Sequence, residues 1–442
     1  MSIRACLGTL LVMSLPLLAQ NSSGTSDASP TGEDRMAVPA SVNTEGYSVA
    51  LGSETRSNYV SGAISFTSAY SDNILGSANG KPVSDESYSI SPSISLDKST
   101  PRLQSMFTYS PGFTFYQHTS DRNQADHNFT TQIQYWLSPH VTISLQDAFH
   151  KTSSFFNQPN PTDNPVPGSI QPPTVAVVAP VADQLSNTGS AQLNYQFGIN
   201  SMVGASGSFG NLHYLDSAQV PGLSDSSSSS ASAFYNHRIS KKHYVGATYQ
   251  FQRILAYPAE GQSETLTHAF LGFYTVYLKP NLSISFSGGP QRLELTLAPF
   301  PVTHSWSPAA TASVGWQSGH TSLAASYART VTGGGGLIAA YHSNSAIASI
   351  RQQLTRNWNA GISGDYSIYK DVTPLFFAPR SGGHTVSGGA SIQRQVGEHL
   401  SMEAGYTRMY QSYGNITIIS TTPDTNRGWI SISYHFARPL GR

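Results

Sequence analysis

Serine lies close to histidine at three places in this chain, where a hydroxyl nucleophile and its base could be sought. The pairs are His150 with Ser153, His304 with Ser305, and His342 with Ser343. A hydroxyl nucleophile needs its base within hydrogen-bond reach. Adjacent residues of a strand point to opposite faces, so the second and third pairs could act only with help from a neighbouring strand. We therefore expect that the protein is not an enzyme.

Metal, phosphate and thiol sites are not predicted either. The 14 histidines and the scattered carboxylates show no metal-ligand spacing. The glycine-rich stretch 333–336 is not followed by Lys-Ser or Lys-Thr, so we interpret it as a loop and not as a phosphate cradle. The only cysteine, Cys6, lies in the first 20 residues, which leaves no thiol beyond them. We expect no cofactor.

Strands are the elements that carry these polar residues. In residues 358–369, Trp358, Ile362 and Ile368 alternate with polar or small residues such as Ser363 and Asp365. Successive side chains of a strand point to opposite faces, so this segment has one apolar and one polar face. A chain built from such strands must cover or hydrate each face, and a closed membrane barrel does both.

The bulk composition agrees with such a wall. Of the 442 residues, 38% are hydrophobic and only 11% are charged, with uncharged polar residues filling the difference. The formal net charge is zero, so nothing predicts a nucleic-acid partner. No segment after the first 20 residues approaches the roughly 18 apolar residues of a membrane helix.

The chain divides into four predicted parts. Residues 1–20 are typical of a secretory signal peptide, with Arg4 before an apolar stretch and Ala19 near its end. Residues 21–57 are polar without a period and predict a flexible periplasmic arm. Residues 58–436 form the predicted barrel, and 437–442 a short C-terminal tail.

The joints between strands predict the topology. About 18 strands (16–18) follow one another, and tight joints alternate with longer ones, the largest being 155–186. Short periplasmic turns and long outer loops produce this alternation, which places both termini in the periplasm. We expect Pro92 to mark a bulge or kink, since proline removes a ladder hydrogen bond. The tight joints are 98–101, 138–140, 198–201, 240–243, 279–281, 318–320, 355–357 and 397–399.

The chain resembles Gram-negative outer-membrane β-barrels of the putative β-barrel porin type. The motifs that carry this resemblance are AYSDNIL (69–75), YSPGFTFY (109–116), HNFTTQIQYWLSPHVTISLQDAF (127–149) and WISISYHF (429–436). It implies an up-and-down antiparallel barrel in a bacterial outer membrane, in contact with lipid. The ending, with Ile432, Tyr434 and Phe436, resembles the signal that the barrel-assembly machinery recognises. It departs from the usual pattern because residues 437–442 follow the aromatic residue.

Candidate pore residues come from one loop and from the polar strand faces. In general porins the loop between the fifth and sixth strands folds inward, and residues 155–186 hold that place here. Their candidate constriction residues are Asp163, Asp183, Val177 and Val178; the alternative is an ordinary surface loop. The candidate lumen-facing residues are Asp365, Glu403, Gln132 and Gln134.

These observations predict a porin-like passive channel for small hydrophilic solutes, because a barrel of this size encloses water. The alternative is a non-channel barrel that serves an export or surface-polysaccharide assembly. Nothing in the sequence marks a subunit interface, so a monomer and a homo-oligomer both stay open.

Overall fold

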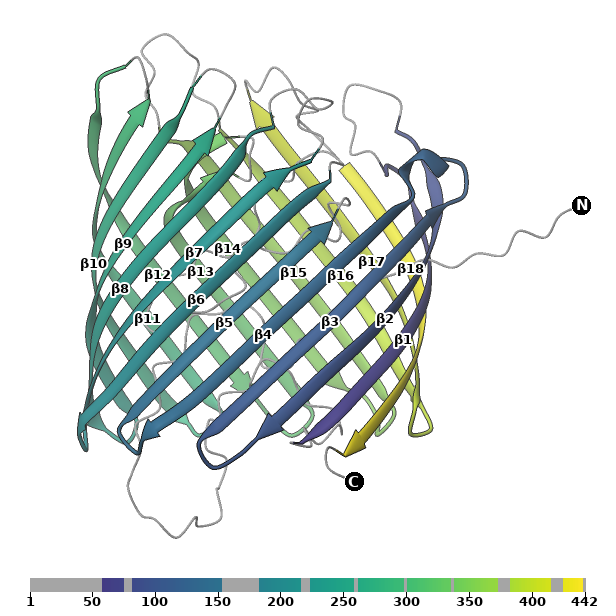
Figure 1. Cartoon of the computed structure of the whole chain (residues 1–442), viewed down its shortest axis with the longest axis horizontal. Helices are drawn as coiled ribbons and strands as arrows, with labels where there is room; N and C mark the ends of the chain where they lie inside the picture. The colour runs from purple at the N-terminus through teal and green to yellow at the C-terminus, as the bar shows by residue number, and fades with distance from the viewer. Residues whose placement is uncertain are drawn as a thin grey trace, which may run out of the picture.

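The chain folds into one closed antiparallel β-barrel of 18 strands, in which β1 pairs with β18 (Figure 1). The computed structural model describes residues 58–74, 82–152, 183–215, 223–257, 261–297, 300–334, 338–372, 382–414 and 424–439. This topology confirms the predicted fold class. Among these residues no helix is long and apolar enough to cross a membrane.

The strands are β1 (Tyr59–Ser71), β2 (Asp85–Ser99), β3 (Leu103–Tyr116), β4 (Gln124–Ser138), β5 (Val141–Thr152), β6 (Gln184–Gly198), β7 (Ser201–Tyr214), β8 (Asp225–Ser240), β9 (His243–Tyr257), β10 (Ser263–Lys279), β11 (Leu282–Leu297), β12 (Thr303–Gln317), β13 (Thr321–Gly334), β14 (Ile338–Gln353), β15 (Trp358–Asp371), β16 (Gly382–Val396), β17 (Leu400–Gly414) and β18 (Asp424–Pro439). A short 3-10 helix, η1 (Ser120–Arg122), precedes β4.

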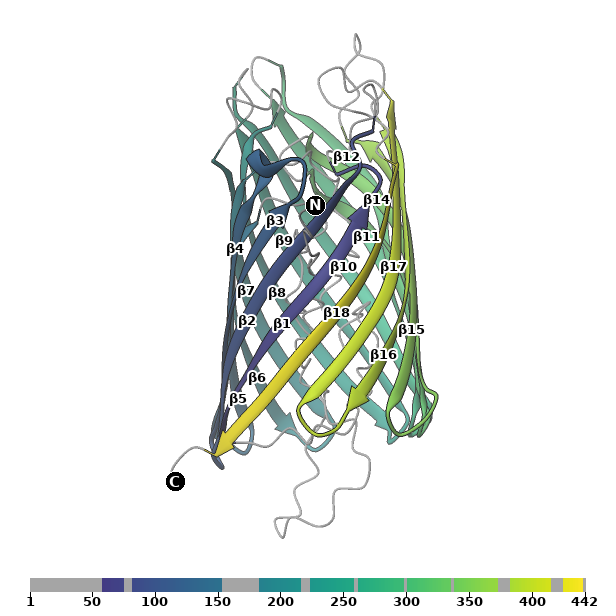
Figure 2. The ribbon, with the colours of Figure 1, turned by 90° about the vertical axis from the view of Figure 1, so that its right-hand side faces the viewer.

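The two ends of the barrel differ in the length of their joints. At one end, here called the turn end, every joint has two to four residues, and all eight predicted tight joints fall there. At the other, the loop end, the joints run from three residues (335–337) to 31 (153–183). The β13–β14 joint is therefore short, which breaks the expected strict alternation. The first residue of β1 and the last of β18 meet at the turn end (Figure 2).

The wall has an apolar outer face and a mostly polar inner face. In β2, Ile90 and Ile94 are exposed on the outside, whereas Ser89 and Ser91 are buried on the inside. The same alternation places large exposed side chains such as Tyr249 and Phe286 outside. Because the side-chain period of a strand is two, one register fixes both faces along the whole strand.

The barrel closes where an aromatic ring covers a glycine. On the outer face Phe436 of β18 lies over Gly62 of β1, and a Cβ at Gly62 would overlap the ring. On the inner face Trp429 covers Gly405 in the same way. An aromatic ring over a cross-strand glycine shields the backbone and fixes the register.

Pro92 interrupts the ladder, as expected, but the expected bulge is absent from the pairing of β2 with β3. The β2–β3 pairing stops after Ile90 and resumes at Ile94 in unchanged register, without a bulge. In that register Pro92 stands opposite Pro111, so neither strand offers an N–H at this position. Two prolines that face each other leave a gap in the ladder and cause no shift.

The predicted end of the barrel is also extended by the structure. β18 continues past Phe436, and Ala437, Arg438 and Pro439 pair with the first residues of β1. The first three residues of the predicted tail are thus part of the wall.

Candidate functional site

Pairs of hydroxyl groups cover much of the inner wall. Ser and Thr side chains from neighbouring strands lie opposite each other and hydrogen-bond across the ladder. A hydroxyl can donate and accept a hydrogen bond, so the two hydroxyls of a pair bond to each other. Together they form a polar surface without charge. The pairs include Ser65–Ser433 (2.8 Å), Ser89–Thr114 (2.6 Å), Ser206–Ser232 (2.7 Å), Thr275–Ser285 (2.8 Å) and Ser287–Thr311 (2.8 Å).

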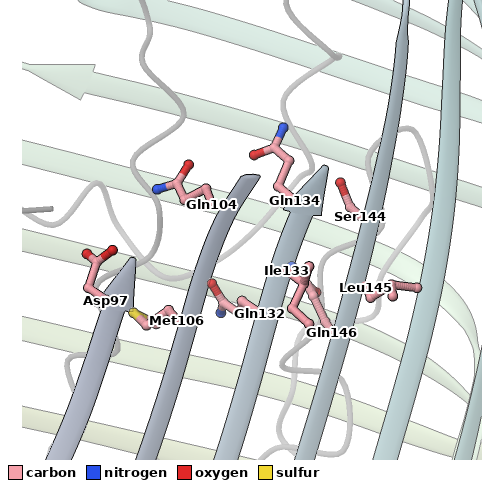
Figure 3. A pocket seen from close by; sticks show the side chains of 9 residues that line it. All are labelled: Asp97, Gln104, Met106, Gln132, Ile133, Gln134, Ser144, Leu145 and Gln146. Carbon is pink, nitrogen blue, oxygen red and sulfur yellow. The ribbon is translucent and has the colours of Figure 1, made fainter. Parts of the chain in front are cut away.

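Four glutamine side chains from β3, β4 and β5 gather around one hollow near the turn end (Figure 3). The hollow has a volume of about 60 Å³, enough for a few water molecules. Asp97 and Ser144 also line it, and one carboxylate oxygen of Asp97 is buried without a hydrogen-bond partner. Amides both donate and accept, so the hollow can exchange hydrogen bonds with water or a polyol. The four glutamines are Gln104, Gln132, Gln134 and Gln146.

Two of the candidate lumen-facing residues, Gln132 and Gln134, thus belong to this one hollow. The other two lie on another part of the wall, in β15 and β17. Asp365 of β15 accepts a hydrogen bond from Ser387 Oγ, and its other carboxylate oxygen is buried without a partner. Glu403 of β17 is hydrogen-bonded to Ser391. Both carboxylates are held by serines of β16, which lies between their strands.

The predicted constriction loop lies mostly outside the described residues. Asp163, Val177 and Val178 are among those that the structure does not describe. Asp183 is described and stands directly before β6, where its carboxylate lies 3.9 Å from Lys151 Nζ. Lys151 pairs in register with Leu185, on the face opposite to buried Thr152. Asp183 is therefore placed at the outer side of the rim and not in the interior.

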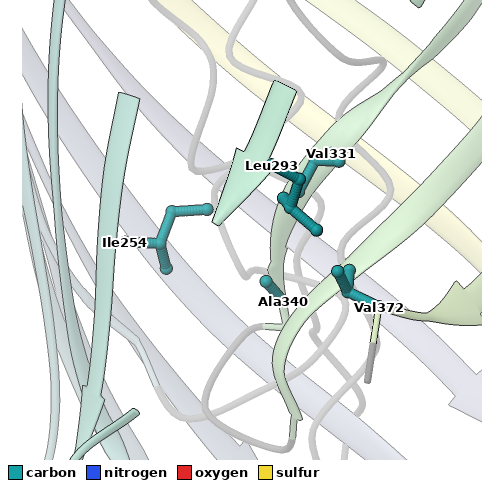
Figure 4. Close-up of a cluster of buried hydrophobic side chains, with 5 residues drawn as sticks. All are labelled: Ile254, Leu293, Val331, Ala340 and Val372. Atoms are coloured by element: carbon teal, nitrogen blue, oxygen red, sulfur yellow. The ribbon is translucent and has the colours of Figure 1, made fainter. Parts of the chain in front are cut away.

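Apolar side chains buried inside the barrel are a feature that the sequence analysis missed. Near the loop end, Ile254, Leu293, Val331, Ala340 and Val372 form one buried cluster (Figure 4). Leu271 of β10 is 0% exposed and packs with Ala269 and Ala309 in a second cluster nearby. The signal in the sequence was segment 264–278, which is apolar on both faces and fits no simple wall with one polar side.

Two of the histidines have other partners in the structure, and Ser153 lies outside the described residues. His150 Nδ1 lies 2.8 Å from Asn128 Oδ1, and His304 Nδ1 lies 3.3 Å from Glu294. Elsewhere His435 Nε2 lies 3.2 Å from Ser401 Oγ, a contact between strands that spacing alone cannot show. In the described part of the chain no carboxylate contacts His435, and no three His, Cys, Asp or Glu side chains gather as metal ligands would.

No family model matches the sequence, and no curated protein matches it. Among solved structures, the FrpB iron transporter from Neisseria meningitidis (F3-3 variant) is 9% identical with a TM-score of 0.42, covering 86% of this chain and 82% of that one. OccAB4 from Acinetobacter baumannii is 8% identical with a TM-score of 0.41, covering 87% and 99%. OpdQ from Pseudomonas aeruginosa is 8% identical with a TM-score of 0.41, covering 86% and 98%. Similarity this low says nothing about the solute or mechanism of this protein.

The first half of the glycine-rich stretch differs from its interpretation as a loop, and residues 335 and 336 lie outside the described residues. Gly333 and Gly334 belong to β13, and the β13–β14 register shifts between them. Such a bulge bends a strand and increases its twist. The bend lies at the loop end, next to Val331 of the apolar cluster.

Proposed function

We propose that the protein is an outer-membrane β-barrel that acts as a porin-like passive channel for small hydrophilic solutes. The observation that supports this most strongly is the inner wall, where hydroxyl pairs and a glutamine hollow line a closed barrel. Barrels of 16–18 strands are wide enough to leave an aqueous channel. A neutral wall of this kind hydrates solutes without binding one charge strongly.

The outer face supports the membrane part of the proposal. Exposed aromatic and aliphatic side chains such as Phe66, Phe286 and Ile430 cover the outside of the wall. A bilayer needs such a belt, because it offers no hydrogen bonds to polar groups. In the proposed outer-membrane barrel, the short turns and both termini face the periplasm.

The expected partners follow from this location. The belt contacts outer-membrane lipid, and the exposed Ile432, Tyr434 and Phe436 of β18 would present the signal that the assembly machinery reads. We expect neither catalysis nor a cofactor, and we propose no nucleic-acid partner.

Osmotic swelling of proteoliposomes tests the channel. The refolded chain from residue 21 is placed in vesicles, and swelling is followed in a pentose, a hexose and a trisaccharide. We expect fast swelling that slows as the sugar grows. A folded barrel whose vesicles swell no faster than protein-free vesicles in any sugar would overturn the proposal.

A second function is favoured by one observation. Large inner side chains such as Leu271, in the middle of β10, and Leu293, near the loop end of β11, are almost fully buried, so part of the interior is filled. A barrel of this kind could serve an export or surface-polysaccharide assembly without conducting solutes. Vesicles that do not swell in any sugar would favour this second function over the channel.

A further inference from the structure

The ends of β13 and β14 separate from β12 at the loop end. We call residues 330–334 and 338–341 the inner hairpin. β12 pairs with β13 only from Ala310 onward, opposite Arg329, although β12 itself begins at Thr303. Residues 303–309 of β12 therefore pair with β11 alone within the described part of the barrel.

The inner hairpin lies against strands that are remote along the wall. Cα atoms of β14 come within 8 Å of Cα atoms in β9 and β10. Strands in a sheet are spaced by about 4.8 Å, so four spacings would set β14 about 19 Å from β10 along the wall. The contact is formed because the hairpin separates from β12 while it stays paired with β15.

The hairpin is on the inside of the barrel. Its partners Ile254 and Leu293 lie on the face opposite to the exposed Tyr249 and Phe286, which is the inner face. Val331 is 1% exposed and Ala340 is 2% exposed, so the contact excludes water. In Figure 4, Leu293 stands beside Val331, and Ile254 reaches toward them from its own strand. The outward side of the hairpin thus packs on the inner side of the wall.

The other side of the hairpin is fastened to β15. Tyr341 and Tyr369 pack edge to face with ring centroids 4.5 Å apart, and both are 1% exposed. Val372, just after β15, belongs to the apolar cluster as well. Because β14 stays paired with β15 up to Asp371, the hairpin can move only together with the end of β15.

The edge of β12 beside the hairpin has no strand partner among the described residues, and its only proline there, Pro308, offers no N–H. If the β12–β13 register continued past Ala310 and Arg329, Ser307 would stand opposite Thr332, and Pro308 opposite Val331. The free part of β12 presents Trp306, which is 71% exposed on the outer face. A free strand edge is a ready pairing site. The same hairpin thus has two docking sites, the inner wall and the edge of β12.

We propose that the inner hairpin is a gate that moves between these two sites. Docked on Ile254 and Leu293, it narrows the interior with an apolar surface; paired with β12, it completes the wall and widens the interior. This inference rests on the proposed channel function, because a gate needs a path to close. It names the constriction as the β13–β14 hairpin and not the β5–β6 loop.

Engineered disulfides test both positions, since the chain from residue 21 contains no cysteine. Leu293→Cys with Val331→Cys would lock the hairpin on the inner wall. Ser307→Cys with Thr332→Cys would lock it onto β12. The four single-cysteine variants are the matched controls, and the reduced form of each double variant is its own control for folding, followed by heat modifiability on gels.

We expect both disulfides to form on oxidation in vesicles. The inner-wall lock should lower the single-channel conductance or abolish it, the β12 lock should raise it above the reduced protein, and reduction should reverse both changes. Equal conductance of the two locked forms would overturn the gate, as would a β12 disulfide that never forms in folded protein. If both disulfides form but no variant conducts ions in either redox state, the channel function is wrong. The two positions of the hairpin would still be established by the disulfides.

Discussion

Val331 of β13 and Leu293 of β11 are buried in one apolar cluster inside the barrel, although β12 lies between their strands in the sheet. In a simple wall these two residues would be separated by a full strand, and Val331 would face outward. The contact shows that the end of β13 crosses behind β12 on its inner side. The hydroxyl pairs make most of the inner surface polar. At the loop end this cluster makes the inner surface apolar.

The energetic coupling of these two residues can be measured. Leu293→Ala should lower the free energy of unfolding in lipid vesicles by about 2–3 kcal/mol, because it leaves a cavity in a dry cluster. Val331→Ala removes part of the same contact, so the double variant should show a coupling energy of at least about 0.5 kcal/mol. Denaturant titrations of the two single variants and the double variant give this value.

A matched control for the cycle is Leu145→Ala on the outer face of β5, which is 44% exposed. Its effect should add to that of Leu293→Ala without coupling. Strict additivity of Leu293→Ala and Val331→Ala would contradict the packing described above.

Asp147 stands in the middle of the outer belt. It pairs with Thr131, which lies midway between His127 and Tyr135 on the outer face of β4, and with Gly189 on the other side. A carboxylate facing lipid is unfavourable, although less so than Lys or Arg at about 2–4 kcal/mol. Asp147→Leu should therefore raise the free energy of unfolding in vesicles by about 1 kcal/mol or more.

The control for Asp147 is Asp121→Leu in η1, whose side chain is 78% exposed. It should leave stability unchanged within about 0.5 kcal/mol. A loss of stability in Asp147→Leu would show that the carboxylate contacts a polar partner in the membrane, such as a second copy of the chain.

The seam between β1 and β18 offers a test of the last strand. Gly62→Val should push the ring of Phe436 away from β1, and Phe436→Ser should remove the ring. We expect Phe436→Ser to lower the amount of folded protein in outer membranes, while refolding of the purified chain in detergent is affected less. Equal losses in the two assays would assign Phe436 a packing role alone and contradict its part in recognition by the assembly machinery.

The glutamine hollow predicts a change of ion selectivity. Gln132→Lys or Gln134→Lys would place a cation in the hollow that Asp97 also lines. Reversal potentials in a salt gradient should shift toward anion selectivity, because a charge that lines a pore attracts its counter-ion. Ile133→Leu, on the outer side of the same strand, should leave the potential unchanged. An unchanged potential in both lysine variants would show that ions do not pass this hollow.

The strands and tight turns could be predicted because their signals are local. Ile430, Ile432 and Tyr434 alternate with serines in the sequence itself, and the alternation survives in β18. The inner hairpin could not be predicted, because it depends on a contact between β14 and β10 that no spacing reveals. The second apolar face of β10 has a different cause, since Leu271 packs with Ala269 and Ala309, and Phe273 lies over Gly246 of β9.

The positions of two charged residues near strand ends can also be predicted from the alternation of side chains along each strand. The sequence sets Arg253 and Arg408 in phase with apolar faces, which predicts positions near a membrane interface or beyond a bulge. In the structure Arg253 Nε lies 2.6 Å from Glu264, and Arg408 pairs with Asp424, both at the loop end. Asp183 was harder to place, since its partner Lys151 belongs to the preceding strand across a long joint.

Single-channel conductance of the refolded chain from residue 21 in a planar bilayer tests the central claim most directly. The account predicts discrete, stable steps that grow when Val331→Asn places an amide in the apolar cluster and weakens the docked hairpin. A folded, heat-modifiable barrel that stays silent in both forms would contradict it.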